Sequence, residues 1–382
     1  MRITFVLPYA GLAGGIRVLA IYANRLHERG HTVTVVSIPK SRLGLKKKIS
    51  ILLRTRQWPS VDSEPSHFDV TAIRPHVIES NRAVVDDDVP DADVVIATFW
   101  KTAPWVAAMS PKKGVKVIFL QGYETSPGQW DPETDRVWQL PLHKIVVSSW
   151  LKDLARIRFA DENVICIPNS VEADDFSSPP RSKHPILTVG FLYNSIHLKG
   201  VDVALAALAE IKTASSSLRV IAFGAEHVST NLPLPDWVEF HYRPTQQEIR
   251  DIYRSCDVWL CASRQEGFHL PPLEAMACRC PVVSTRVGGP QDIIQDGVNG
   301  FLVEVSDHRA LAKRVLQIAA MDDEAWRRMS DAARATATRY TWDDATDLFE
   351  KALTEIARSE LRRRPSSQEV NPIYAAHPPR EP

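Results

Sequence analysis

Short apolar runs alternate with longer amphipathic stretches along most of this 382-residue chain. The first apolar run, 2–8, precedes a segment, 14–30, in which apolar residues recur at helical spacing until Gly30. Further runs of strand length lie at 31–38, 92–99, 115–121, 144–149 and 163–169. Because strands separated by helical stretches are typical of parallel sheets, we expect an α/β domain with a doubly wound sheet over 1–172.

A polar, proline-rich segment separates this region from a second alternating set. We interpret 173–185 as a linker, because proline and polar residues interrupt strands and helices there. Strands are then expected at 186–191, 218–224, 237–242, 257–263 and 280–285, and helices at 200–212, at 245–256 and from about Pro271. This set predicts a second Rossmann-like domain over 186–339. An amphipathic helix is expected over 340–359, and the tail 360–382, rich in Pro, Ser and charge, is expected to be disordered.

Length, charge and cysteine usage narrow the class of protein. At roughly 100–200 residues per domain, a chain of 382 residues predicts two domains. The formal net charge of zero gives no reason to expect a nucleic-acid partner, and no apolar run reaches the roughly 18 residues of a membrane span. The apolar N-terminus breaks at Pro8, so we interpret it as a strand rather than a signal peptide. The five cysteines, an odd number in apolar contexts, predict buried free thiols in a cytoplasmic protein.

Two glutamates, Glu266 and Glu274, flank a turn between a buried strand and a helix. Proline is favoured at the first helical position, so the helix is expected to begin at or near Pro271. The main-chain amides of 267–270 would then lie at the positive end of the helix dipole, which suits a phosphate. Carboxylates accept hydrogen bonds from paired hydroxyls, so the two acids suit a ribose and a sugar on either side of that phosphate. Without a ligand, Glu274 would be an ordinary acid of a first helical turn.

The stretch 266–294 resembles the E-x7-E motif of retaining glycosyltransferases of the GT-B fold, family 4. The similarity continues over nearly the whole chain, in the same order, at 14–36, 164–172, 198–212, 248–268, 288–303 and 340–353. The resemblance implies two Rossmann-like domains whose parallel sheets face a central cleft. The first would bind the acceptor and the second the nucleotide-sugar, and the closing helix, 340–359, would pack back on the first domain.

The resemblance also implies roles for particular residues. Glu274 would bind the nucleotide ribose, Glu266 would face the donor sugar, and Lys199 would hold the diphosphate, so that Glu266 and Lys199 form the catalytic pair. The other residues placed near substrate are Gly267, Phe268, His269, Leu270, Gly14, Gly15, Arg243, Arg264, Gln121, Tyr123, Glu124 and Asn169.

The chain departs from the family's pattern at three places. Phe191 stands where members often have an arginine, so Arg264 or Arg243 is a candidate for the missing charge. His269 stands where glycine is frequent, which predicts a different sugar pocket. The residues 121–124 replace a stretch in which many members have a histidine near the donor sugar.

Electrostatics gives the expected mechanism. Cleavage of the anomeric bond places negative charge on the leaving diphosphate, which preorganised amides, a helix N-terminus and Lys199 would stabilise. By the resemblance, the glycine loop 10–15 would face the acceptor, or the diphosphate as well, across the cleft. We expect no enzymic nucleophile, no cofactor beyond the nucleotide-sugar, and no metal, because the three aspartates at 86–88 lie in a polar loop. The glycines at 11–15 lack the spacing of a dinucleotide-binding fingerprint, and no acid ends the second strand, so a dehydrogenase is not expected.

A basic segment with interleaved apolar residues, 40–58, allows two interpretations. It could lie on an anionic membrane or hold a lipid diphosphate, which would favour a lipid-linked or envelope-polysaccharide acceptor at the inner membrane face. It could equally be a basic surface of the first domain. The alternatives to a transferase are a sugar-nucleotide epimerase, a phosphorylase of the same fold, and a binding protein that transfers nothing.

Overall fold

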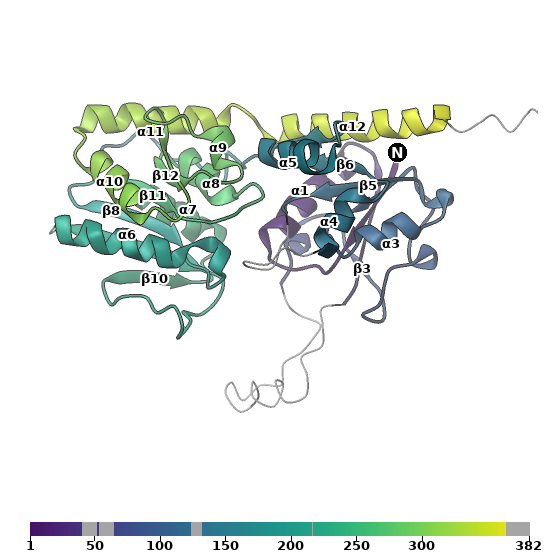
Figure 1. The fold of residues 1–382 in the computed structure, drawn as a ribbon, viewed down its shortest axis with the longest axis horizontal. Coiled ribbons are helices and arrows are strands. Elements are labelled where there is room, and N and C mark those ends of the chain that lie inside the picture. The colour runs from purple at the N-terminus through teal and green to yellow at the C-terminus, as the bar shows by residue number, and fades with distance from the viewer. Residues whose placement is uncertain (40–51, 53–64, 124–131, 216, 364–382) are drawn as a thin grey trace, which may run out of the picture.

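The computed structural model describes residues 1–39, 52, 65–123, 132–215 and 217–363. Within these ranges the chain forms two α/β lobes that lie side by side (Figure 1), each built on a parallel sheet. None of the described helices combines the length and the apolar character needed to cross a membrane.

The N-terminal lobe contains a seven-stranded sheet in the order β3-β2-β1-β4-β5-β6-β7, and every neighbouring pair is parallel. Its strands are β1 (Arg2–Leu7), β2 (Thr32–Ser37), β3 (His76–Val77), β4 (Val94–Ala97), β5 (Val115–Leu120), β6 (His143–Val146) and β7 (Ile165–Cys166). Its helices are α1 (Gly14–Glu28), α3 (Ala103–Ala108), α4 (Pro132–Gln139) and α5 (Ser149–Phe159). The central strand β4 is buried along its whole length, which explains its continuous apolar sequence.

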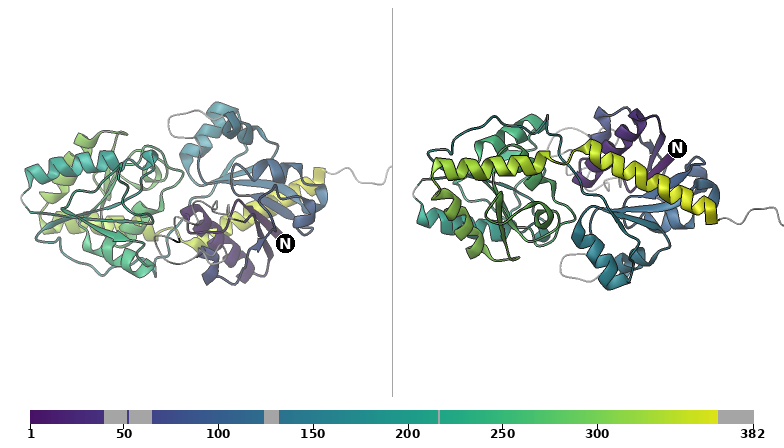
Figure 2. Two further views of the ribbon diagram at one scale, coloured as in Figure 1. Left: turned by 90° about the horizontal axis from the view of Figure 1, so that it is seen from below. Right: turned by 90° about the horizontal axis from the view of Figure 1, so that it is seen from above.

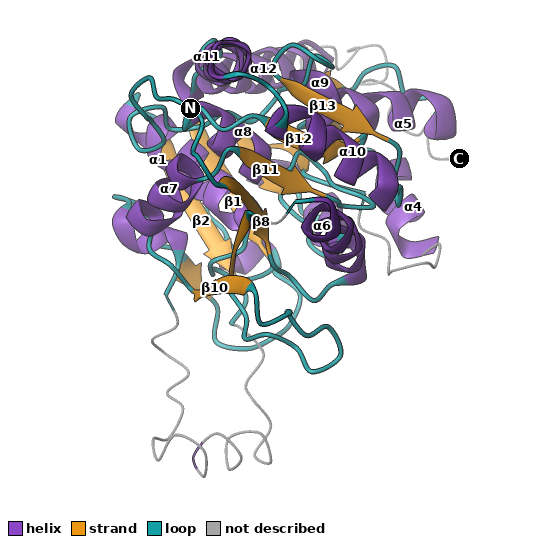
Figure 3. Ribbon diagram, turned by 90° about the vertical axis from the view of Figure 1, so that its left-hand side faces the viewer, coloured by secondary structure: helices purple, strands orange, loops and turns teal. Residues whose placement is uncertain are grey.

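The C-terminal lobe contains a six-stranded parallel sheet in the order β10-β9-β8-β11-β12-β13. Its strands are β8 (Leu187–Leu192), β9 (Leu218–Gly224), β10 (Val238–Tyr242), β11 (Val258–Cys261), β12 (Val282–Thr285) and β13 (Gly300–Val303). Its helices are α6 (Val201–Ala214), α7 (Gln246–Ser255), α8 (Leu270–Ala277), α9 (Pro290–Ile293), α10 (His308–Ala319) and α11 (Asp323–Thr338). Figure 3, which looks onto this lobe, shows the strands between α7 and α8 on one side and α6 and α10 on the other. The expectation of two doubly wound parallel sheets is thereby confirmed.

The polar segment predicted as a linker lies between the two sheets, because β7 ends at Cys166 and β8 begins at Leu187. The strand expected over 163–169 is shorter than its apolar run, with only two residues paired to β6. All five cysteines are free, and four of them are buried.

The last helix, α12 (Trp342–Arg363), leaves the C-terminal lobe and runs along the N-terminal lobe (Figures 1 and 2). Phe349 stacks on Tyr22 of α1 at a centroid distance of 4.4 Å and meets Phe119 of β5 edge-on at 5.3 Å. Arg29 of α1 donates to Glu350 at 3.1 Å. The helix extends beyond Ser359, into the segment expected to be disordered, because residues such as Glu360 and Leu361 favour helix.

We expect Phe349→Ala to lower the free energy of unfolding by about 3–5 kcal/mol, because it empties a fully buried aromatic site. Urea unfolding followed by circular dichroism would measure the loss. Leu348→Ala on the same helix is the control, since Leu348 is 43% exposed and should change stability by about 0.5 kcal/mol or less. Equal losses in the two variants would show that α12 does not pack through this face.

Candidate active site

The ends of β8 and β11 mark the point where the strand order of the C-terminal sheet reverses. Open α/β sheets bind ligands at such a point, outside the carboxyl ends of the strands. The segment after β8 reaches Lys199, at the end of a short 3-10 turn (His197–Lys199), and the segment after β11 carries Glu266 to His269 into α8. The topology therefore brings Lys199 and Glu266 together although 66 residues lie between them in sequence.

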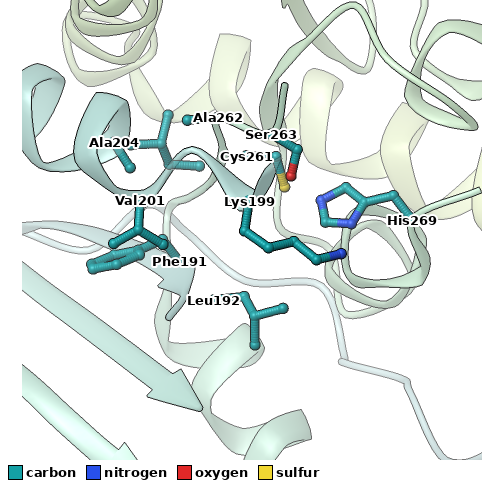
Figure 4. Close-up of a pocket in the computed structure, with 10 residues that line it drawn as sticks. Phe191, Leu192, Lys199, Val201, Ala204, Cys261, Ala262, Ser263 and His269 are labelled. Carbon is teal, nitrogen blue, oxygen red and sulfur yellow. The ribbon is translucent and has the colours of Figure 1, made fainter. Parts of the chain in front are cut away.

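Glu266 is the centre of a buried polar cluster. The Lys199 ammonium donates to both carboxylate oxygens of Glu266 at 2.8 Å, and the Ser263 hydroxyl donates to Oε1 at 2.8 Å. Nδ1 of His269 lies 3.2 Å from the same oxygen. The side chain of Glu266 is only 8% exposed, whereas that of Lys199 is 29% exposed. Figure 4 shows Lys199 and His269 extending toward each other next to Ser263.

Charge and burial oppose each other at Glu266. Burial raises the pKa of the carboxyl, but the positive charge that His269 carries when protonated in acid, the charge of Lys199, and the hydrogen bonds from Lys199 and Ser263 outweigh burial, so the pKa lies below its ordinary value. Burial lowers the pKa of His269 to about 4, so its imidazole is neutral at pH 7. At neutral pH the cluster therefore holds one carboxylate, one ammonium and one neutral imidazole.

His269 adopts a backbone conformation that favours glycine, with φ of 76° at the N-cap of α8. Its side chain is nevertheless buried against Glu266, and Nε2 has no hydrogen-bond partner among the described residues. The small cavity beside it, about 10 Å³, is also lined by Phe191 and Lys199. A positive φ at a non-glycine residue is strained and persists only where the surrounding structure enforces it. Such backbone strain occurs frequently at functional sites.

Glu274 lies in the second turn of α8 rather than the expected first turn, because the helix already begins at Leu270. It is also buried and ion-paired, but its cation comes from the other lobe. Arg17 of α1 donates through Nη1 to Oε1 of Glu274 at 2.6 Å, and the Tyr253 hydroxyl donates to Oε2 at 3.0 Å. Sequence reasoning did not select Arg17. Its position two residues after the glycine pair at the start of α1 was the available signal.

The two lobes also meet through the main chain at Gly267. Its carbonyl accepts hydrogen bonds from the Ser148 hydroxyl at 2.8 Å and from the Trp150 indole at 2.9 Å. A Cβ added at Gly267 would lie 1.6 Å from the carbonyl oxygen of Gln121, so only glycine fits where these two main-chain segments come so close together. Gln121 in turn donates to the carbonyl of Gly15 at 3.0 Å.

A cavity of about 280 Å³ opens beside this contact, next to Glu266. Tyr123 and Trp150 line it from the N-terminal lobe, and Arg264 and Glu266 line it from the C-terminal lobe. Gln265 donates to the carbonyl of Tyr123 at 2.5 Å and so connects the two walls. The arrangement provides a space of ligand size between the lobes, bordered by a buried carboxylate.

The remaining predicted residues differ in burial and in their surroundings. Phe268 is buried, with its carbonyl bonded to the amide of Gly289, and Leu270 begins α8. A Cβ at Gly14 would meet no atom within 4 Å, so Gly14 borders open space. Asn169 is buried after β7, and its Oδ1 has no partner among the described residues.

The two arginines considered as replacement cations are both engaged elsewhere. Arg264 donates to both carboxylate oxygens of Asp202, at 2.8 and 2.6 Å. Arg243 follows the edge strand β10 and donates to the carbonyl of Ala225. Glu124 and the basic segment 40–58, except Leu52, lie outside the described residues.

The aspartates at 86–88, expected in a polar loop, form a short 3-10 turn in which none of the three is buried. Asp88 pairs with Arg82 at 2.6 Å, and Asp86 accepts the amide of Ser110 at 3.0 Å.

Known structures share this arrangement of two lobes. Sucrose-phosphate synthase from Thermosynechococcus elongatus superposes with a TM-score of 0.71 at 15% identity, over 94% of this chain and 100% of that one. Anabaena HepE in complex with UDP-glucose gives 0.71 at 17% identity, over 93% and 100%. Two parallel α/β sheets, joined by a linker and by a returning C-terminal helix, thus define a GT-B fold.

Sequence comparison finds a family match over the linker and most of the C-terminal lobe. The profile of the glycosyl transferases group 1 family matches residues 183–321, which hold both glutamates and Lys199. A D-inositol 3-phosphate glycosyltransferase of Xylanimonas cellulosilytica is 29% identical over 56% of this chain and 56% of its own length. An N-acetyl-alpha-D-glucosaminyl L-malate synthase of Bacillus anthracis is 34% identical over 36% of this chain and 37% of its own. The chain thus spans about half of these curated relatives or less, and the match to the group 1 glycosyltransferase profile is confined to residues 183–321.

The depressed pKa of Glu266 predicts a pH-dependent contribution to stability. Because the folded-state pKa lies below the ordinary 4.5, ionised Glu266 stabilises the fold fully above about pH 4.5, and this contribution is lost as pH falls further. Glu266→Gln should therefore lower the free energy of unfolding by about 1–3 kcal/mol at pH 7, and the difference from wild type should decrease below pH 4.5. Chemical denaturation at several pH values measures this difference.

Glu304→Gln is the matched control, because the side chain of Glu304 is 79% exposed. It should show almost no gap at any pH. A gap for Glu266→Gln that stays constant or widens as pH falls would contradict the ionised pair.

Proposed function

We propose that this chain is a retaining glycosyltransferase that moves a sugar from a nucleotide-sugar to an acceptor hydroxyl. The observation that carries the proposal is the buried Lys199–Glu266 pair at the switch point of the C-terminal sheet, directly before the start of α8. A cation and a helix N-terminus at one place suit a diphosphate, and the carboxylate beside them suits the hydroxyls of a sugar.

The donor would lie across the start of α8. Its diphosphate would contact Lys199 and the main chain of 267–270, its ribose would contact Glu274, and its sugar would enter the cavity next to Glu266. HepE, a structural neighbour, holds UDP-glucose, which makes UDP-sugars the first donors to test.

The reaction then follows from where charge develops. The bond between the anomeric carbon and the diphosphate oxygen breaks, and the electron pair leaves on the phosphate. The acceptor oxygen attacks from the same face, and its proton passes to a phosphate oxygen of the leaving group. Lys199 stabilises the new negative charge, and Glu266 orients the sugar, so no enzymic nucleophile is needed.

The finer parts of the proposal concern the acceptor and the location. We infer a carbohydrate or lipid-linked sugar as acceptor, in envelope polysaccharide or glycolipid synthesis, on the cytoplasmic side of the membrane. The basic and apolar residues of 40–58 support contact with an anionic membrane surface.

A screen of UDP-, GDP- and dTDP-sugars, read as donor hydrolysis without acceptor, tests the catalytic proposal. One donor class should be hydrolysed, and Lys199→Ala should slow that hydrolysis by about 100- to 1000-fold, because it removes a cation from the leaving group. Glu266→Ala should abolish it. Glu304→Ala, at an exposed acid, should leave the rate unchanged.

Two outcomes would contradict the proposal. Binding of a nucleotide-sugar without hydrolysis or transfer would favour a binding protein, and an altered sugar still attached to its nucleotide would favour an epimerase. The same assay with a chelator tests metal independence, since activity lost with the chelator and restored by manganese would disprove it.

A further inference from the structure

Arg17 is the residue through which the N-terminal lobe reaches the proposed ribose site. It lies in the first turn of α1, and its guanidinium donates to Oε1 of Glu274 at 2.6 Å across the cleft. The Tyr253 hydroxyl occupies Oε2 of the same carboxylate. Both oxygens that would accept ribose hydroxyls are therefore already engaged.

The surroundings of Arg17 require that it keep an anionic partner. Its side chain is 18% exposed, and that of Glu274 is 8% exposed. The guanidinium also lies over the ring of Phe176, 5.5 Å from the centroid. Because a largely buried cation is strongly destabilising when its partner is removed, Arg17 cannot release Glu274 without another anion nearby.

The proposed donor brings such an anion, and this step rests on the proposed function. The ribose hydroxyls would replace Arg17 on Glu274. The diphosphate is attached to the same ribose through its 5′ carbon, so it arrives within a nucleotide's length of the displaced guanidinium. The long arginine side chain can cross that distance by changing rotamers, and a guanidinium matches phosphate oxygens in geometry and charge.

The cations of the C-terminal lobe have other partners. Lys199 donates to both oxygens of Glu266, and Arg264 donates to both oxygens of Asp202. Phe191, where β8 approaches its end, is buried and contributes no charge. A diphosphate carries more negative charge than Lys199 alone balances.

We propose that Arg17 is a donor-binding residue that exchanges Glu274 for the donor's diphosphate when the nucleotide binds. The direct ion pair between the lobes is then replaced by two contacts to the ligand: the ribose binds Glu274, and the phosphate binds Arg17. The nucleoside part of the donor competes with Arg17 for Glu274, whereas the diphosphate part binds Arg17.

This exchange predicts opposite effects of one substitution on two ligands. In Arg17→Ala, affinity for UDP should fall by about 10- to 100-fold, because a charged phosphate contact is lost. Affinity for uridine should rise several-fold, because its ribose no longer displaces an arginine. Calorimetry or competition binding measures the ratio of the diphosphate affinity to the nucleoside affinity. The ligand pairs are UDP and uridine, GDP and guanosine, and dTDP and thymidine, and the pair used is the one whose diphosphate binds the wild-type protein.

Two further variants act as controls. Arg17→Gln keeps much of the side chain's length and should shift the ratio in the same direction, so the test survives if Arg17→Ala fails to fold. Arg25→Ala removes another half-buried arginine of α1, which pairs with Glu172 and is 23% exposed, and should leave both affinities unchanged.

The outcomes separate this inference from the function on which it rests. Equal loss of diphosphate and nucleoside affinity in the Arg17 variants, or no change in either, would show that Arg17 only fastens the lobes together. Failure of folded wild type to bind any of the three diphosphates would overturn the proposed function itself.

Discussion

Two buried carboxylates that flank the start of one helix impose the constraint on which the cleft depends. An ionised carboxylate inside a protein is strongly destabilising unless a cation and hydrogen bonds compensate for the lost water. Glu266 receives its cation, Lys199, from the same lobe, whereas Glu274 receives Arg17 from the opposite lobe. The ion pair of the second acid therefore connects α1 to α8 across the lobes.

The parallel topology makes this pairing possible. Each sheet reverses its strand order beside the strand that begins its lobe, β1 or β8, so ligand-binding segments gather at one edge. The two edges approach closely enough that main chain meets main chain at Gly267 and Gln121. Ser148 and Trp150 satisfy the carbonyl that this contact buries. Because α12 also returns to the N-terminal lobe, the lobes are connected at the cleft and along the last helix.

The sequence predicted the parts of this structure that rest on local patterns. Apolar runs such as Val94–Ala97 are read as buried strands because both faces of a parallel sheet are covered. The start of α8 was predicted to within one residue, since proline marks the first helical turn. The strand β13 (Gly300–Val303) is not predicted, because a four-residue strand that begins with glycine gives little periodic signal.

The parts that could not be predicted depend on contacts between distant residues. Arg17 and Glu274 are 257 residues apart, and no local spacing relates them. Arg264 is a sequence candidate for the charge missing at Phe191, but its pairing with Asp202 emerges only when the segment after β11 meets the start of α6. The positive φ of His269 could not be predicted from the histidine itself, and only the frequent glycine at this position in similar sequences indicates it.

A crystal structure of the chain with bound nucleoside diphosphate tests the central claim most directly, namely that the two acids that flank the start of α8 and their cations form the donor site. The account predicts phosphate oxygens within hydrogen-bond distance of Lys199 and of the main chain at 267–270, with ribose hydroxyls on Glu274. Nucleotide density anywhere but between the two lobes at this helix, with both ion pairs left intact, would contradict it.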